Sequence, residues 1–305
     1  MPACGRWWGI DPLAYTGTPV QVGLPQEERL ANRPMDIVHV YHRNGDLFPS
    51  AAERGLALDP VHPRLLLINW KPSTTMTWAA VAAGRVDSRI DQLAAYILHT
   101  FPYRFFLTIW HEPENDVVAT PGSGMTAADY AQMYRHVVLR LRADGVTKAI
   151  TVMDYMGFDN WAQPSWFSQL WPGNDVVDWI GIDPYGTGAA SGWSARDFKT
   201  LVNRPSGSFP GFYTWAIQTH PGKPMMLAEW GVHYDPTNPT GQATFFNSVS
   251  AQISAFPNIK ALVYFDAPLL PSGEGSPTSI TNPAAVTAWR SLGRNGSIVA
   301  PQVVY

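Results

Sequence analysis

Short apolar runs alternate with longer segments of helical periodicity along most of the chain. The runs are rich in β-branched and aromatic residues, and each predicts a buried strand. Eight such runs are present: Arg6–Ile10, Asp36–Tyr41, Arg64–Trp70, Arg104–Trp110, Lys148–Met153, Val176–Ile182, Pro224–Trp230 and Ile259–Phe265. Strands that alternate with helices predict βαβ units and a parallel sheet.

Helical patterns fill most of the connections between these runs. In Thr126–Asp144 the apolar residues recur at i, i+3 and i+4, and Thr126 with Asp129 predicts a capped start. The other predicted helices are Arg85–Phe101, Phe212–His220, Gly241–Phe256 and Asn282–Leu292. Three connections are less clearly helical: Pro19–Asn32, Phe48–Val61 and Trp166–Leu170.

Eight strand–helix units in 305 residues predict an α/β fold, a single (β/α)8 TIM barrel over residues 1–305. The alternative is a doubly wound open sheet, which usually has five or six strands and a glycine-rich phosphate turn after its first strand. Here Asp11-Pro12-Leu13-Ala14-Tyr15 follows the first strand, without GxGxxG. The barrel is therefore the better prediction.

Composition excludes several classes of protein. The chain is 46% hydrophobic and 15% charged, too apolar for a disordered protein. A net charge of −3 gives no basic footprint for nucleic acid, and no apolar run reaches the ~18 residues of a membrane span. The single cysteine, Cys4, excludes an internal disulfide and a cysteine-rich metal site. The 13 Trp, 12 Tyr and 13 Phe remain as an excess of flat side chains.

Residues Met1–Cys4 lack the charged and apolar regions of a signal peptide. We expect a mature extracellular protein whose signal has been removed, with a cytoplasmic protein as the alternative. We also expect a monomer.

Carboxylates and aromatic side chains follow the predicted strands at their carboxyl ends, where TIM barrels build their active sites. Glu112 and Glu229 end the fourth and seventh strands, which face one another across the barrel mouth. Paired carboxyls ~5–5.5 Å apart cleave glycosidic bonds with retention, and a gap of ~6.5–9.5 Å leads to inversion. Such a pair needs no metal or cofactor, and flat rings suit the apolar faces of sugars. The pattern predicts carbohydrate chemistry.

Three motifs carry a family resemblance. Leu107–Glu114 resembles the strand-four motif of clan A glycoside hydrolases, and its His111-Glu112 pair resembles glycoside hydrolase family 26. That family includes β-mannanases and some β-glucanases and β-xylanases. Asp178–Tyr185 and Pro224–Gly231 resemble its strands six and seven, in the same order and at similar spacing.

The resemblance implies a retaining hydrolase with Glu112 as acid/base, Glu229 as nucleophile and Tyr185 hydrogen-bonded to that nucleophile. It implies β-1,4-mannan as the first substrate to consider. Thr108 stands where the family has an arginine, and Pro113–Val118 lacks a family tryptophan. The chain thus resembles a divergent member. A β-glucan, a β-xylan and a bacterial cell-wall polysaccharide or exopolysaccharide stay open as substrates.

Other residues at the strand ends are expected to contact a polysaccharide or oligosaccharide. Those expected to hydrogen-bond are His39, Tyr41, His42, His111 and Tyr185. Those expected to stack on sugars are Trp70, Trp110, Trp193 and Trp230. Glu114 is the alternative to Glu112 as the acid, although it lies further into the loop.

Two alternatives belong to other functional classes. A metal-dependent hydrolase could use His39, His42, His111, Asp183 and Asp266, although the spacing of zinc sites is not evident. Activity that survives a strong chelator would exclude it. A non-catalytic glycan-binding barrel is the other alternative, and binding without release of reducing sugar would favour it.

Overall fold

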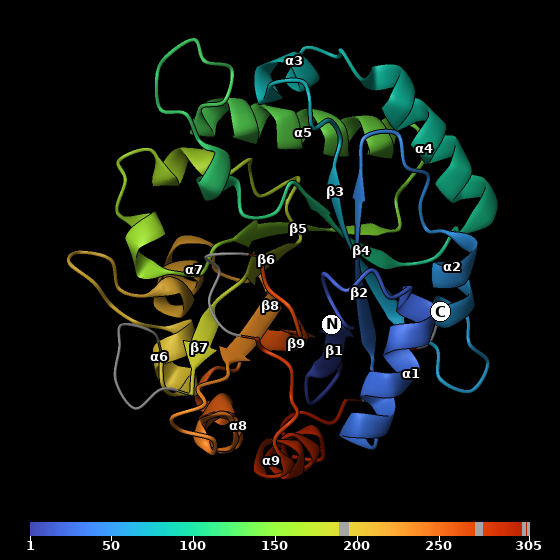
Figure 1. Cartoon of the computed structure of the whole chain (residues 1–305). Coiled ribbons are helices and arrows are strands. Elements are labelled where there is room, and N and C mark those ends of the chain that lie inside the picture. The colour runs from blue at the N-terminus through green and yellow to red at the C-terminus, as the bar shows by residue number, and fades with distance from the viewer. Residues whose placement is uncertain (189–194, 272–276, 301–302, 304–305) are drawn as a thin grey trace.

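Eight parallel strands close into a barrel because β6 pairs with β8, joining the two ends of the strand order β6-β5-β4-β3-β2-β1-β9-β8 (Figure 1). The computed structural model describes residues 1–188, 195–271, 277–300 and 303. The strands of the barrel are β1 (Trp7–Asp11), β2 (Ile37–Arg43), β3 (Leu65–Lys71), β4 (Phe105–Ile109), β5 (Ala149–Tyr155), β6 (Trp179–Ile182), β8 (Met225–His233) and β9 (Ile259–Phe265). They coincide with the eight predicted runs, so the (β/α)8 prediction is confirmed.

The helices lie around the outside of the barrel (Figure 1). They are α1 (Val20–Ala31), α2 (Ala51–Ala57), α3 (Trp78–Ala82), α4 (Asp87–Thr100), α5 (Ala127–Ala143), α6 (Phe198–Val202), α7 (Phe212–Thr219), α8 (Gly241–Gln252) and α9 (Pro283–Gly293). Short 3-10 turns are η1 (Pro113–Asp116), η2 (Asp159–Ala162), η3 (Phe167–Leu170) and η4 (Ile253–Ala255).

All five helical predictions are confirmed, and the less clear connections resolve into α1, α2 and the 3-10 turn η3. The predicted capping box is present at α5: the Asp129 backbone N–H donates to the Thr126 hydroxyl at 3.2 Å, and the Asp129 carboxylate accepts from the Thr126 backbone N–H at 2.9 Å. Short elements were missed, namely α3, α6 and the strand β7 (Tyr185–Thr187), which pairs in parallel with the end of β8. Elements of three to five residues are too short for periodicity to identify.

Apolar side chains fill the barrel interior below the strand ends. A buried cluster includes Leu67, Phe106 and Met226, and Trp7 stacks on Trp179 with ring centroids 6.1 Å apart. A second, larger cluster packs between the strands and the surrounding helices. The polar strand ends therefore sit on a closed apolar base.

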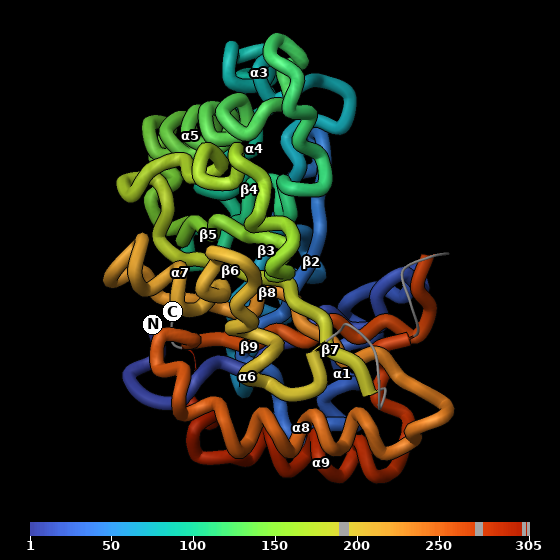
Figure 2. Tube along the Cα trace, turned by 90° about the vertical axis from the view of Figure 1, so that its left-hand side faces the viewer, coloured from blue at the N-terminus to red at the C-terminus, as the bar shows by residue number. Residues whose placement is uncertain are grey.

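The described ends of the chain meet at the amino-terminal ends of the strands. The Arg6 N–H donates to the Ile298 carbonyl at 3.1 Å. Gly5, with φ of 66°, lies so close to the Val299 carbonyl that a Cβ would clash with it. Figure 2 shows both termini on the side of the molecule away from β7. Within the described residues, no helix combines the length and apolar character needed to cross a membrane.

Candidate active site

A cavity of about 610 Å³ opens at the carboxyl ends of the strands. It is lined by Glu112 after β4, Glu229 on β8, His39 and Tyr41 on β2, and His111. The structure thus brings the two predicted catalytic glutamates into one cavity with three of the predicted substrate-binding residues. The rest of the wall comes from Glu53, Phe265 and the chain that follows β1.

Glu229 is held by donors on both carboxylate oxygens. The Tyr185 hydroxyl donates to Oε2 at 2.7 Å, and the Tyr41 hydroxyl donates to Oε1. The Glu229 backbone N–H donates to the buried Asp183 carboxylate at 2.7 Å. Burial and the adjacent Glu229 carboxylate raise the pKa of Tyr185 well above its usual range, so the hydroxyl keeps its proton. These contacts orient a carboxylate and stabilise its negative charge.

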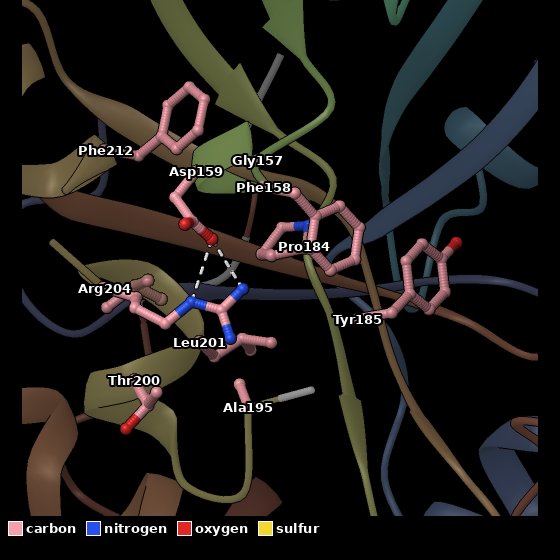
Figure 3. Close-up of a pocket in the computed structure, with 11 residues that line it drawn as sticks. Gly157, Phe158, Asp159, Pro184, Tyr185, Ala195, Thr200, Leu201, Arg204 and Phe212 are labelled. Carbon is pink, nitrogen blue, oxygen red and sulfur yellow. Dashed lines mark hydrogen bonds and ion pairs between the residues drawn. The ribbon is translucent and has the colours of Figure 1, made fainter. Parts of the chain in front are cut away.

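An ion pair between Arg204 and Asp159 lies beside Tyr185. The Arg204 guanidinium donates to Asp159 through Nε at 2.9 Å and through a terminal nitrogen at 2.6 Å. The two residues border a pocket of about 10 Å³, roughly the size of one water molecule. Figure 3 shows Tyr185 at the edge of this pocket with its hydroxyl pointing away from the ion pair. The pair ties the turn after β5 to the segment after α6 beside this tyrosine.

Glu112 occupies a strained position in a turn. Its φ of 51° is in the left-handed region, and its backbone N–H donates to the Asp154 carbonyl at 3.1 Å. One side-chain oxygen accepts from Asn115 at 3.2 Å. Burial, followed by the nearby Glu229 carboxylate, raises the pKa of Glu112 well above its usual range. This shift favours the protonated form of Glu112, which is the form that a general acid needs.

Buried acids and uncharged histidines lie around the two glutamates. Asp154 and Asp183 are completely buried, and burial raises the pKa of each well above its ordinary value. Burial lowers the pKa of His39 and of His111 to about 3, so both imidazoles are uncharged. Glu112 thus lies among buried acids that raise its pKa, and the Lys71 ammonium opposes that rise only in part.

Two curated proteins resemble the chain in sequence, and both have glycanase names. Endoglucanase H of Acetivibrio thermocellus is 25% identical over 231 residues, covering 73% of this chain and 24% of that protein. β-1,3-Xylanase TXYA of a Vibrio species is 30% identical over 102 residues, covering 33% of this chain and 21% of that protein. The chain therefore spans less than a quarter of the length of each. No protein-family model matches the chain.

Solved structures resemble the chain along nearly its whole length. A ruminal GH26 endo-β-1,4-mannanase has a TM-score of 0.65 at 14% identity, covering 98% of this chain and 66% of that one. A GH26 β-mannanase from Bacteroides ovatus has a TM-score of 0.64 at 13% identity, covering 98% and 91%. The chain has the fold of the GH26 mannanases. The family 26 resemblance in its three strand motifs thus agrees with its fold, at a sequence identity that marks a divergent chain.

Two of the tryptophans predicted to stack on sugars lie in the core. Trp230 is completely buried among Trp8, Tyr264 and Trp289. Trp70 is also completely buried, against Phe48. Such burial leaves no ring face for a sugar, so the predictions for Trp70 and Trp230 are corrected. Both rings point outward from the barrel toward the helices. The position of a residue at a strand end does not tell whether its side chain points into the barrel or out toward the helices.

Trp110 and His42 lie outside the cavity lining. Trp110 is enclosed by Trp78 and by the Lys71 ammonium, 4.9 Å from its ring centroid, and it donates to Asp116 at 2.7 Å. His42 contacts Glu53 at 3.1 Å and reaches the site only through that carboxylate. Trp193 lies outside the described residues.

The residues suggested as metal ligands do not form a cluster of the kind a metal needs. Among the described residues, no three His, Cys, Asp or Glu side chains are grouped so that they could hold a metal ion. Asp266 instead anchors the backbone after β1, since its carbonyl accepts from the Ala14 N–H at 2.7 Å.

Glu114, the alternative acid, is buried beside the cavity but does not line it. One of its oxygens accepts from the Met156 N–H at 3.1 Å. Burial raises its pKa to about 8, which makes it a carboxylic acid at neutral pH with a structural position.

We expect Glu114→Gln to flatten the pH dependence of stability. Between pH 4.5 and about 8 the unfolded chain releases this proton and the folded chain keeps it, so wild-type stability falls as pH rises. A shift of this size corresponds to at most about 5 kcal/mol. Chemical denaturation at several pH values between 4 and 9 measures the slope. Buried Glu27 and Asp266 contribute in the same direction, so part of the slope persists. An unchanged slope would contradict the assignment.

Proposed function

We propose that this chain is a divergent family 26 glycoside hydrolase that cleaves a β-linked polysaccharide with retention of configuration. The observation that carries the proposal is the pairing of Glu112 and Glu229 in one cavity, the first with a raised pKa and the second held by Tyr41 and Tyr185. In glycosidases, two carboxyl groups in different environments have different pKa values. This difference decides which one acts as the acid and which one as the nucleophile. Two glycanase-named relatives and the GH26 fold support the same chemistry.

The first step forms a covalent intermediate. The Glu229 carboxylate attacks the anomeric carbon as the glycosidic bond breaks, and Glu112 gives its proton to the departing oxygen. Glu112 is then a carboxylate and removes a proton from water. The water oxygen attacks the anomeric carbon, which releases Glu229 and returns both glutamates to their starting protonation. Tyr185 and Tyr41 orient Glu229 throughout.

We propose β-1,4-mannan as the first substrate, because GH26 β-mannanases share the fold over nearly the whole chain. A β-glucan and a β-1,3-xylan are the next candidates, since the two relatives bear endoglucanase and β-1,3-xylanase names. Polysaccharides are too large and too polar to cross membranes, so we also propose that the protein acts outside the cell.

A panel of polysaccharides tests the proposal. We expect release of reducing ends from at least one β-mannan, β-glucan or β-xylan, and proton NMR early in the reaction should show a β-anomer as the first product. An α-anomer as the first product would contradict the retaining mechanism. Binding without any release of reducing ends would instead favour a non-catalytic glycan-binding barrel.

A further inference from the structure

One wall of the catalytic cavity is formed by a segment to which the sequence motifs assign no role. Asp11 ends β1, and residues 12–15, 17 and 18 continue along the cavity toward α1. This segment supplies more of the cavity lining than any of the barrel strands does. It faces the space beside Glu229, on the far side of the barrel mouth from β4, which carries Glu112.

The backbone of this segment is held in an unfavourable shape. Leu13 has φ of 57° and Tyr15 has φ of 62°, both in the left-handed region that side chains larger than glycine seldom adopt. Asp266 anchors the segment, because its N–H donates to the Asp11 carbonyl at 3.1 Å and its carbonyl accepts from the Ala14 N–H at 2.7 Å. Strain that the surroundings maintain in this way is concentrated at binding sites.

The result of this shape is an exposed aromatic ring at the rim of the cavity. Tyr15 is 58% exposed, and its ring meets Phe265 edge-on with centroids 5.7 Å apart. Phe265 lines the cavity and in turn meets Tyr185 edge-on at 6.1 Å. A row of rings therefore runs from the tyrosine that holds the nucleophile to the rim.

Asp11 adds a polar group at the base of the same wall. Its side chain lines the cavity near Glu229, and burial, followed by that carboxylate, raises its pKa well above the usual range. A protonated carboxyl can donate one hydrogen bond and accept others, which suits the hydroxyls of a neutral sugar.

We propose that Asp11 and Tyr15 form a sugar subsite on the glycone side of the cleaved bond, with Tyr15 stacked on a pyranose ring and Asp11 hydrogen-bonded to sugar hydroxyls. This inference rests on the proposed function. The side follows from the chemistry: the acid must reach the departing oxygen, so the leaving group lies toward Glu112. The wall that follows β1, three strands away from β4, then holds the units that stay on the nucleophile. An aromatic platform beside a polar group is the usual composition of a site for a neutral ligand.

Kinetics of Tyr15 variants on the best polysaccharide of the panel test the subsite. We expect Tyr15→Ala to lower kcat/KM about tenfold, mainly through KM, and Tyr15→Phe to stay within about twofold because it keeps the ring. Asp11→Ala should raise KM more than Asp11→Asn does, since the amide still forms hydrogen bonds. Tyr103→Ala is the matched control, because Tyr103 is exposed but precedes β4 at the other end of the barrel.

The outcomes separate this subsite from the proposed function. If the wild type cleaves a polysaccharide and Tyr15→Ala matches it in KM and product sizes, the subsite is wrong while the hydrolase stands. If the wild type cleaves nothing, the proposed function fails, and affinity electrophoresis in gels containing the same polysaccharides decides the subsite. Retardation of the wild type that Tyr15→Ala loses would support the subsite, and equal migration of both would overturn it. Thermal unfolding of each variant shows whether the fold is intact.

Discussion

Replacing Glu229 by alanine is expected to lower kcat on the preferred polysaccharide by about 10⁴-fold or more, the size of loss seen when a nucleophile is removed. The variant has no carboxylate to attack the anomeric carbon, and Tyr41 and Tyr185 lose their common acceptor. Reducing-end release at high enzyme concentration measures the residual rate.

Azide gives this experiment a second readout. A small anion can enter the space left by the carboxylate and attack the anomeric carbon directly, which should restore turnover and yield a glycosyl azide of inverted configuration. Glu229→Gln should still bind the polysaccharide, because it keeps the shape of the side chain. Unchanged hydrolysis by Glu229→Ala would remove Glu229 from the mechanism, and loss of folding in both variants would be visible in their thermal unfolding.

Glu112→Ala should lose about 10²–10⁴-fold in kcat on polysaccharide, since a poor leaving oxygen then departs without a proton. The loss in bond cleavage should be much smaller for aryl glycosides whose phenolate leaves unaided. The wild-type rate should fall at alkaline pH as Glu112, whose pKa is raised by burial and by Glu229, gives up its proton. Activity profiles from pH 4 to 10 on both substrate types measure these effects, and the alkaline limb should be absent from the variant.

Glu114→Gln is the matched control for this prediction. Both acids have raised pKa values and lie two residues apart, but only Glu112 lines the cavity. We therefore expect Glu114→Gln to keep most of the activity on polysaccharide. If it instead lost the alkaline limb while Glu112→Ala kept it, the acid role would belong to Glu114.

Periodicity predicted the barrel because each strand is an unbroken apolar run and each long helix has one apolar face. It gave no prediction for α3 and α6, which are five residues long, or for β7 (Tyr185–Thr187), which pairs with the end of β8 and forms a bridge with Ala195. These short elements form because contacts with neighbouring segments of the fold stabilise them. Such tertiary support leaves no local pattern to recognise.

Residue type and strand position placed the glutamates and the second-strand residues His39 and Tyr41 in one cavity. The same reasoning misplaced Trp70 and Trp230, because a tryptophan at a strand end can turn inward or outward and both choices bury a large ring. The segment from Asp11 to Tyr15 escaped notice for another reason. Its position depends on Asp266, more than 250 residues away in the chain, and on left-handed backbone angles at residues other than glycine.

Gly5 lies against Val299, so the two ends of the described chain are close together. This proximity affects how the protein can be circularly permuted or attached to a support. Both ends of the described chain lie at the amino-terminal ends of the strands, so a short linker could join them. New ends could then be opened in an exposed turn such as residues 59–63, which interrupts no strand. A surface tether or a fused module attached there would leave the cavity that holds Glu112 and Glu229 facing outward. Attachment at this end of the barrel would therefore keep the cavity accessible to large molecules in solution.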